Sequence, residues 1–250
     1  MLNKLNVPFQ TFHNPQHCFC LENNVYYNRT ETMIFQGFSA VFPVELEVFM
    51  KIAGIVAEYN PFHSGHRHHI QTVRRAFGAD SAIVCAMSGN WVQRGQPALA
   101  DKWTRAALAL AQGVDLVLEL PTLWAAASAE PFARGGVGLL AATGVVDILS
   151  FGSEAGDLAP LQQVAHCLHS PAWKTELRRA LDKGLSFPAA RQSALEAMGL
   201  SGSLLESPNN ILAVEYCKAI LAQHSPMRPL PIRREGSYHA QTPDCENPSA

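Results

Sequence analysis

The stretch KIAGIVA at 51–57, which runs directly into EYNPFHSGH at 58–66, decides the fold of this chain. A short apolar run of this kind is typical of a buried strand, and the pattern at 65–77 predicts a helix. Pro61 and Gly65 lie in the turn between them, and Gly65 lets a ligand approach the backbone closely. Two histidines, His63 and His66, therefore stand where a strand passes into a helix.

The alternation of strand and helix continues along the chain. We expect further strands at 80–87, 114–120 and 145–151, and helices at 101–112 and 128–142. Asp101 is the expected cap of the first of these helices, and glycines at 135, 136 and 138 are expected to loosen the second. The order predicts an α/β fold, a Rossmann-like, doubly wound parallel sheet with ligands outside the carboxyl ends of the strands.

The chain after about residue 157 is predicted to be mostly helical. The expected helices are 158–169, 171–183, 187–199 and 209–223, and an extended stretch near 230–233 is expected to return to the sheet. The predicted fold class is thus α/β: a Rossmann-like, doubly wound parallel sheet with a helical region after it.

Composition restricts the class of protein. The chain has 250 residues, 48% of them hydrophobic, and a formal net charge of −2, which is not the composition of a basic nucleic-acid binder. It has neither a long apolar run nor a basic, then apolar, N-terminus, so we expect no membrane association and no secretion. Six cysteines without a CxxC pair fit reduced thiols and a cytoplasmic location. Nothing in the sequence points to a protein partner.

Residues 1–49 differ from the rest. They contain one alanine, Ala40, although alanine dominates after Met50, and they show no sustained period of 2 or 3.6. We expect 1–49 to be a non-homologous, irregular N-terminal extension, with Met50 as the true start and 50–250 as the ATP-binding domain. The alternative is a genuine but irregular extension.

The HxGH turn carries the chemistry. A helix N-terminus offers N–H groups and a positive dipole end to phosphates, and His63 and His66 can add hydrogen bonds as charge develops on the α-phosphate and the leaving pyrophosphate. Transfer of an adenylyl group from ATP is the predicted reaction. A zinc site built from this histidine cluster is the competing interpretation, but no carboxylate or cysteine completes a zinc set, so no metal site is predicted. His68 and His69 are expected to be surface residues.

A polar loop, MSGNWVQRGQPA at 87–98, follows the second strand and faces the same sheet edge. Arg94 in this loop, with Lys102 and Arg105 on the next helix, could hold phosphate or carboxylate. The alternative is a solvated loop and a helix with ordinary surface charges.

Two later segments add candidates. Gly152, in FGSE at 151–154, would let the adenine or ribose pack against backbone, or it belongs to a plain turn. Asn209 and Asn210 can contact the ribose or base, whereas Ser207 or Asn209 could merely cap a helix. Basic residues after the last strand, Arg233 and Arg234, could reach ATP phosphates or RNA.

With these motifs in order, the chain from Met50 onward resembles the tRNA(Met) cytidine acetate ligase family. The resemblance rests on VAEYNPFHSGH at 56–66, MSGNWVQRGQPA at 87–98, Lys102-Trp103, GVDLVLELP at 113–121, FARG at 132–135, FGSE at 151–154 and SPNNILAVEY at 207–216. It implies an enzyme that uses ATP, with Mg²⁺, to convert acetate to acetyl-adenylate. The acetyl group then passes to N4 of the wobble cytidine of elongator tRNA(Met).

The resemblance also implies site residues. His63 and His66 would be catalytic. The ATP site would comprise Val56, Ala57, Glu58, Tyr59, Asn60, Pro61, Phe62, His63, Ser64, Gly65, His66, Arg67, His68, His69, Gly152, Asn209, Asn210, Arg233 and Arg234. Arg234 stands where the family is expected to have an apolar residue. Family members continue past the Ser249-Ala250 end with a helical domain, so we expect a C-terminally truncated member.

Two other functions remain open from the residues alone. One is a small-molecule adenylyltransferase of the HxGH nucleotidyltransferase superfamily, which the chain from Met50 onward also resembles. The other is a non-catalytic nucleotide- or RNA-binding module.

Overall fold

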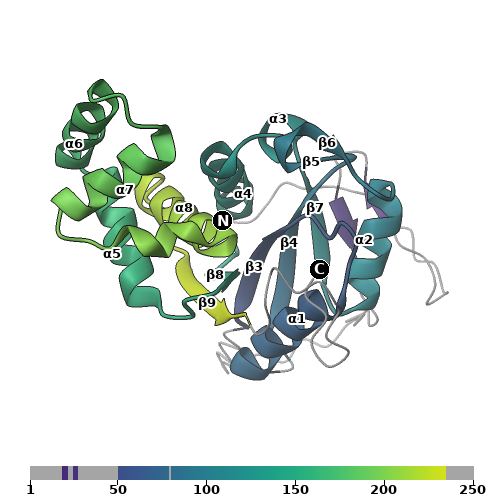
Figure 1. The fold of residues 1–250 in the computed structure, drawn as a ribbon. Coiled ribbons are helices and arrows are strands. Elements are labelled where there is room, and N and C mark those ends of the chain that lie inside the picture. Colours follow the sequence, from purple (N-terminus) through teal and green to yellow (C-terminus); the bar gives the residue numbers. More distant parts are fainter. Residues whose placement is uncertain (1–18, 22–24, 28–49, 79, 235–250) are drawn as a thin grey trace, which may run out of the picture.

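A parallel sheet forms the centre of the structure. The computed structural model describes residues 19–21, 25–27, 50–78 and 80–234, and within them the parallel strands run in the order β7-β4-β3-β8-β9 (Figure 1). Their bounds are β3 Ile52–Ala57, β4 Ala82–Ser88, β7 Leu116–Leu120, β8 Ile148–Ser153 and β9 Arg228–Arg233. The doubly wound sheet predicted from the alternating pattern is confirmed.

The strand order reverses beside β3. The chain proceeds from β3 outward to β4 and β7, then returns to the other side of β3 with β8 and β9. Ile55 is therefore paired with Cys85 on one side and with Ser150 on the other. Such a reversal opens a crevice at the carboxyl ends of the two central strands, where ligands bind in open α/β sheets.

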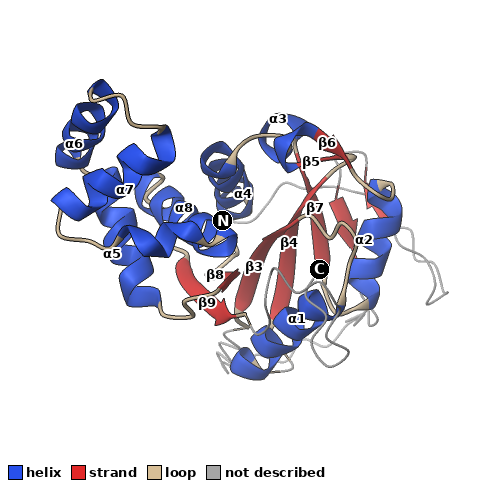
Figure 2. Cartoon of the chain, in the orientation of Figure 1, coloured by secondary structure: helices blue, strands red, loops and turns tan. Residues whose placement is uncertain are grey.

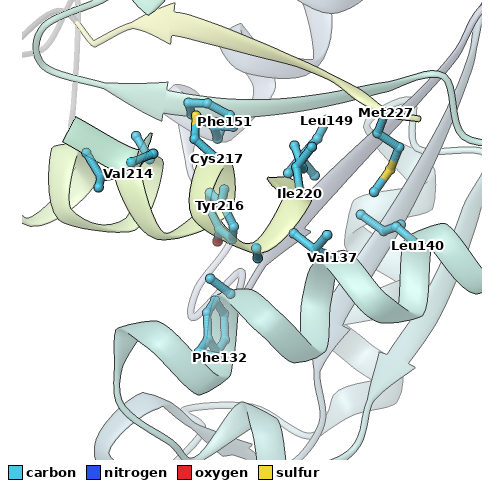
Figure 3. Packing of buried hydrophobic residues seen from close by; sticks show 14 of the residues in the cluster. Phe132, Val137, Leu140, Leu149, Phe151, Val214, Tyr216, Cys217, Ile220 and Met227 are labelled. Carbon is cyan, nitrogen blue, oxygen red and sulfur yellow. The ribbon is translucent and has the colours of Figure 1, made fainter. Parts of the chain in front are cut away.

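Helices cover both faces because side chains alternate along each strand. One face packs on α1 (Ser64–Phe77) and α2 (Lys102–Ala111), through buried residues such as Ile70 and Ala109. The other face packs on α4 (Ala129–Ala142) and α8 (Pro208–Ala222), where Phe151, Tyr216 and Val137 share one hydrophobic cluster (Figure 3).

The helical region beyond the fourth parallel strand is also confirmed. It comprises α5 (Leu158–His169), α6 (Pro171–Asp182), α7 (Phe187–Ala197) and α8, and it lies to one side of the sheet (Figure 2). None of the helices in the described part of the chain combines the length and apolar character needed to cross a bilayer.

Two of the three glycines in α4 allow close packing, and the helix runs unbroken through all three. A Cβ at Gly136 would lie 2.7 Å from the side chain of Val56 on β3. A Cβ at Gly135 would lie 2.3 Å from the ring of Trp124 in the short helix α3 (Thr122–Ala125). Gly136 therefore lets α4 approach the sheet, and Gly135 lets it approach α3.

Several short elements were not predicted. Strands β5 (Trp91–Val92) and β6 (Gln96–Pro97) form a small hairpin in the loop after β4, around the turn η1 (Gln93–Gly95). Strands β1 (Phe19–Leu21) and β2 (Val25–Tyr27) extend the sheet beside β7 by antiparallel pairing. These six residues are regular where an irregular extension was expected. The rest of 1–49, and 235–250, lie outside the described residues, and the domain boundary at Met50 stays an expectation.

Candidate nucleotide site

A cavity of about 400 Å³ opens at the carboxyl ends of β3, β8 and β9. It brings together most of the predicted site residues: Val56, Ala57, Glu58, Tyr59, Asn60, Pro61, His63, Gly65, His66, His68, His69, Gly152, Asn209, Arg233 and Arg234. These residues come from segments almost 180 positions apart in the sequence, roughly from 56 to 234. The sheet crevice, rather than any single motif, assembles the site.

His63 and His66 organise the turn between β3 and α1. His63 is the N-cap of α1, and its Nδ1 accepts a hydrogen bond from the Gly65 N–H at 3.1 Å. The His66 Nδ1 in turn accepts from the His63 N–H at 3.2 Å, and the ring centroids lie 3.6 Å apart. Because each Nδ1 is an acceptor, the proton of each neutral ring resides on Nε2. Both rings are thereby left with one N–H that can donate to a ligand.

Both histidines are held in the neutral form. Burial, reinforced by the neighbouring His63, His69 and Arg234 charges, lowers the pKa of His66 to about 3. Burial and the positive charge of Arg234 also lower the pKa of His63. Tyr59 packs against His66 with ring centroids 4.9 Å apart, and it is itself buried at a φ of 48°. The turn therefore presents neutral donors in a fixed geometry at neutral pH.

His68 and His69 differ from each other. His68 is exposed, as predicted, and its Nε2 lies 3.4 Å from the Thr72 hydroxyl. His69 is half-buried rather than exposed: its Nε2 is 2.7 Å from Ser150 Oγ on β8, and burial lowers its pKa to about 4. Position 69 shares a face of α1 with Val73, one turn further along, which is fully buried. Within the described residues, no group of three His, Cys, Asp or Glu side chains is arranged to hold a metal ion.

Two arginines add positive charge to the cavity. Arg233 and Arg234 both line it, at the end of β9. The Arg234 Nη1 donates to Asn209 Oδ1 at 3.1 Å, and its aliphatic carbons lie 3.3 Å from the position of a Cβ on Gly152. Gly152 lies within β8 rather than in a turn after it. A side chain at position 152 would therefore displace the guanidinium group that faces the histidines.

Glu154 joins these residues to α8. Its Oε1 accepts from Asn209 Nδ2 at 2.7 Å, and its Oε2 accepts from the Asn210 backbone N–H at 2.9 Å. Ser207 occupies the N-cap position but makes no side-chain cap, so Glu154 caps α8 instead. Asn210 is buried, with its Oδ1 2.7 Å from Ser153 Oγ, and it does not line the cavity. Asn209 is the member of the pair that faces the ligand space.

Arg105 was wrongly regarded as a candidate phosphate ligand. It is 1% exposed and donates to the backbone carbonyls of Ala100, Glu58 and Gly89. Lys102 forms an ion pair with Glu119 at 2.7 Å, and Arg94 is exposed on the hairpin turn. Arg105 therefore holds the two loops after β3 and β4 together, and Asp101 caps α2 as predicted.

Comparison with known proteins identifies the family of this chain. A family model described as HIGH Nucleotidyl Transferase matches residues 50–250. The chain belongs to this family. A tRNA(Met) cytidine acetate ligase from Syntrophomonas wolfei is 51% identical over 199 residues, covering 76% of this chain and 48% of that protein. One from Halothermothrix orenii is 42% identical over 80% of this chain and 51% of its own length.

Solved structures of a relative match the fold of this chain. Thermotoga maritima TmcAL bound with alpha-thio ATP matches with a TM-score of 0.69 and 42% identity, over 75% of this chain and 48% of that one. The apo form of that protein matches with a TM-score of 0.70 and 43% identity. The chain spans about half the length of the curated relatives it matches.

Three residues of the predicted ATP segment at 56–69 lie outside the cavity lining. Phe62 packs against Tyr59 and His66, with centroids 4.9 and 5.4 Å away, and so supports the turn. Ser64 and Arg67 are exposed. Together with Asn210, they remain predictions as ATP contacts.

The cavity also has lining residues that the sequence did not reveal. They are Ile55, Gln93, Phe132, Phe151, Leu212, Tyr216 and Ile232. Most are apolar residues within predicted strands and helices, where they look like ordinary core. Gln93 lies in the polar loop at 87–98, Phe132 in FARG, Phe151 in FGSE, and Leu212 and Tyr216 in SPNNILAVEY. The segments of these five residues were therefore singled out, though the residues themselves were not.

Proposed function

We propose that this cavity binds ATP, with the triphosphate between the His63–His66 pair and the arginines at the end of β9. The observation that carries the proposal is the stacked histidine pair, whose Nδ1 atoms are both engaged by backbone N–H groups. This arrangement leaves two Nε2–H donors at the N-terminus of α1, where the helix dipole also favours an anion.

We further propose that the enzyme activates acetate. A carboxylate oxygen of acetate attacks the α-phosphorus in line, and the bond to the oxygen that bridges to the β-phosphorus breaks. Pyrophosphate leaves with the electron pair, and acetyl-adenylate remains. The histidine donors and Arg233 or Arg234 stabilise the charge that gathers on the phosphate oxygens, and the reaction requires positioning more than a base.

The acceptor in this proposal is N4 of the wobble cytidine of elongator tRNA(Met). The amine attacks the acetyl carbonyl, the carbon–oxygen bond to AMP breaks, and the nitrogen loses a proton. The names of the relatives, tRNA(Met) cytidine acetate ligase, support this acceptor, and a relative's structure with alpha-thio ATP supports the nucleotide. The chain spans about half the length of those relatives, so acetate and tRNA are proposed as its substrates.

Mg²⁺ would accompany ATP, but the described lining offers little to hold it. Glu58 carries the only carboxylate among the described lining residues, and its Oε1 already accepts from the Gln93 N–H at 2.7 Å. Mg²⁺ usually keeps several waters and binds through substrate phosphates plus one or two carboxylates. We therefore assign no step of the mechanism to a protein-bound cation.

Acetate-dependent ATP–pyrophosphate exchange tests the proposed activity. The chain should exchange label only when acetate is added, and His63→Ala and His66→Ala should lower the rate by at least about a hundredfold, as expected for loss of a transition-state donor. His166→Ala, on an exposed position of α5, is the matched control. Wild-type exchange in either site variant would sink the histidine assignment. ATP binding without any exchange would favour a non-catalytic nucleotide-binding module.

A further inference from the structure

The cavity lining has two ends of different chemistry. The end formed by α1, β8 and β9 is cationic or hydrogen-bonding, with His69, Arg233 and Arg234. The other end is formed by the loops after β3 and β4 together with α4 and α8, and it combines Glu58 and Gln93 with the rings of Phe132 and Tyr216. The triphosphate, with the adenosine beside Gly152 and Asn209, accounts for the first end and leaves the second without a role.

Gln93 presents a buried donor at the second end. Its backbone N–H is bound by Glu58 Oε1 at 2.7 Å, which fixes the residue in the hairpin turn. Its side-chain Nε2 is buried and has no hydrogen-bond partner among the described residues. Buried amide donors are almost always paired, and an unpaired one costs about 1–3 kcal/mol. A carbonyl oxygen of a bound molecule would satisfy it.

Rigid aromatic rings limit the space beside this donor. Phe132 on α4 and Tyr216 on α8 are 2% and 4% exposed, and they lie on two helices that pack against each other (Figure 3). Phe151 on β8, which also lines the cavity, packs against Tyr216 with ring centroids 5.6 Å apart. Rings anchored in the core on three elements cannot move apart cheaply, so this end accommodates a short apolar group.

We propose that the Gln93 end of the cavity is the subsite for the acyl group of the acyl-adenylate. Gln93 Nε2 donates to the acyl carbonyl oxygen, and Phe132 and Tyr216 pack against a short alkyl chain. The inference rests on the proposed function, since it requires the nucleotide to lie in the same cavity. In this arrangement Gln93, Phe132 and Tyr216 select an acid with a short alkyl chain.

Glu58 gives this subsite a preference between free and activated acid. A carboxylate ligand carries a charge that the neighbouring Glu58 carboxylate repels, whereas the acyl carbonyl of an adenylate is neutral. Burial raises the pKa of Glu58, although the Gln93 N–H and Arg105 oppose that shift. In its charged form Glu58 therefore favours the activated acyl group over the free acid.

Binding measurements on the 250-residue chain test the subsite without requiring turnover. The ligands are ATP and two stable acyl-adenylate analogues, the N-acetyl and N-pentanoyl derivatives of 5′-O-sulfamoyladenosine, which carry the same charge. The acetyl analogue should bind at least about tenfold more tightly than the pentanoyl one, because the longer chain overpacks the rings. In Gln93→Leu, affinity for the acetyl analogue relative to ATP should fall roughly five- to tenfold, as expected for one lost hydrogen bond. Gln163→Leu, on an exposed position of α5, should keep the wild-type ratio.

The outcomes separate the inference from the function on which it rests. If the wild-type chain binds neither ATP nor the analogues, the proposed function fails. If ATP binds but the two acyl chains bind equally, or the Gln93→Leu ratio is unchanged, the acyl subsite is wrong and the nucleotide site stands. If Gln93→Leu does not fold, the relative affinities of the wild-type chain for the acetyl and pentanoyl analogues still test the acyl subsite.

Discussion

His63 and His66 use Nδ1 to close the first turn of α1, which leaves Nε2 as the ring nitrogen that can donate to a ligand. The same residues therefore serve the fold and the site. His69 extends this pattern by linking α1 to Ser150 on the neighbouring strand β8. Each of these rings is neutral because of its surroundings, so protonation should oppose the folded state.

Acid should destabilise the protein through these histidines. The folded pKa values of His66, about 3, and His69, about 4, lie below the unfolded value of about 6.5, so the unfolded chain binds more protons between these limits. The contribution of these two histidines to the free energy of unfolding is therefore fully present above a pH of about 6.5 and is lost as the pH falls toward 4. In His69→Gln this loss should be smaller by roughly 1 kcal/mol per pH unit, measured as the free energy of urea unfolding at pH 7, 6 and 5.

The matched control for that series is His166→Gln, an exposed histidine on α5. Its unfolding free energy should keep the wild-type dependence on pH. An unchanged slope in His69→Gln would contradict the neutral, buried state assigned to that ring.

Glu154 should affect both stability and nucleotide affinity. Glu154→Ala leaves the Asn210 N–H and Asn209 Nδ2 without their acceptor, which should cost about 1–3 kcal/mol of unfolding free energy. It also frees the Asn209 amide from the orientation that receives Arg234, so ATP should bind more weakly in a titration. Glu154→Gln, which keeps one acceptor oxygen, should be intermediate.

Glu206→Ala serves as the comparison, because Glu206 is exposed just before the same helix. It should change the unfolding free energy by less than about 0.5 kcal/mol. Equal effects of the two alanine variants would show that Glu154 has no special role at α8.

The close packing of helix α4 depends on two of its glycines, Gly135 and Gly136. Gly136→Ala should destabilise the protein by about 1–3 kcal/mol, because the new methyl group meets Val56 on the central strand. Gly138→Ala is the matched control: its Cβ meets only the flexible end of Gln223, at 3.2 Å. There the gain in helix propensity, up to about 1 kcal/mol, should make the change neutral or stabilising. Thermal unfolding of the two variants checks the contrast, and a stabilised Gly136→Ala would contradict the packing of α4.

Long periodic elements could be predicted from the sequence, and short ones could not. Strand β3 and helix α5 have strong patterns over several residues, and their predicted bounds agree with the structure to within a residue. The hairpin β5–β6 and helix α3 are too short to show a period, and their positions follow from tertiary contacts. Arg105 was misassigned for the same reason, since only the fold places backbone carbonyls around its guanidinium group.

For the whole molecule, the strand order explains which residues form the site. Reversal of the order beside β3 places the HxGH turn at the same sheet edge as Gly152 and the arginines at the end of β9. The sequence order of the motifs indicated the same residues, whereas the apolar end of the cavity was hidden because its rings also belong to the core. Family membership over 50–250 extends this architecture to relatives about twice as long.

Titration of the 250-residue chain with ATP tests the central claim, that the HxGH turn and the β9 arginines form one nucleotide site. Wild-type protein should bind one ATP. His66→Ala and Arg233→Ala should each weaken binding by roughly tenfold or more, as expected for loss of a hydrogen bond to a charged group, while His166→Ala should match the wild type. Unchanged affinity in both His66→Ala and Arg233→Ala, with the proteins folded, would contradict the account.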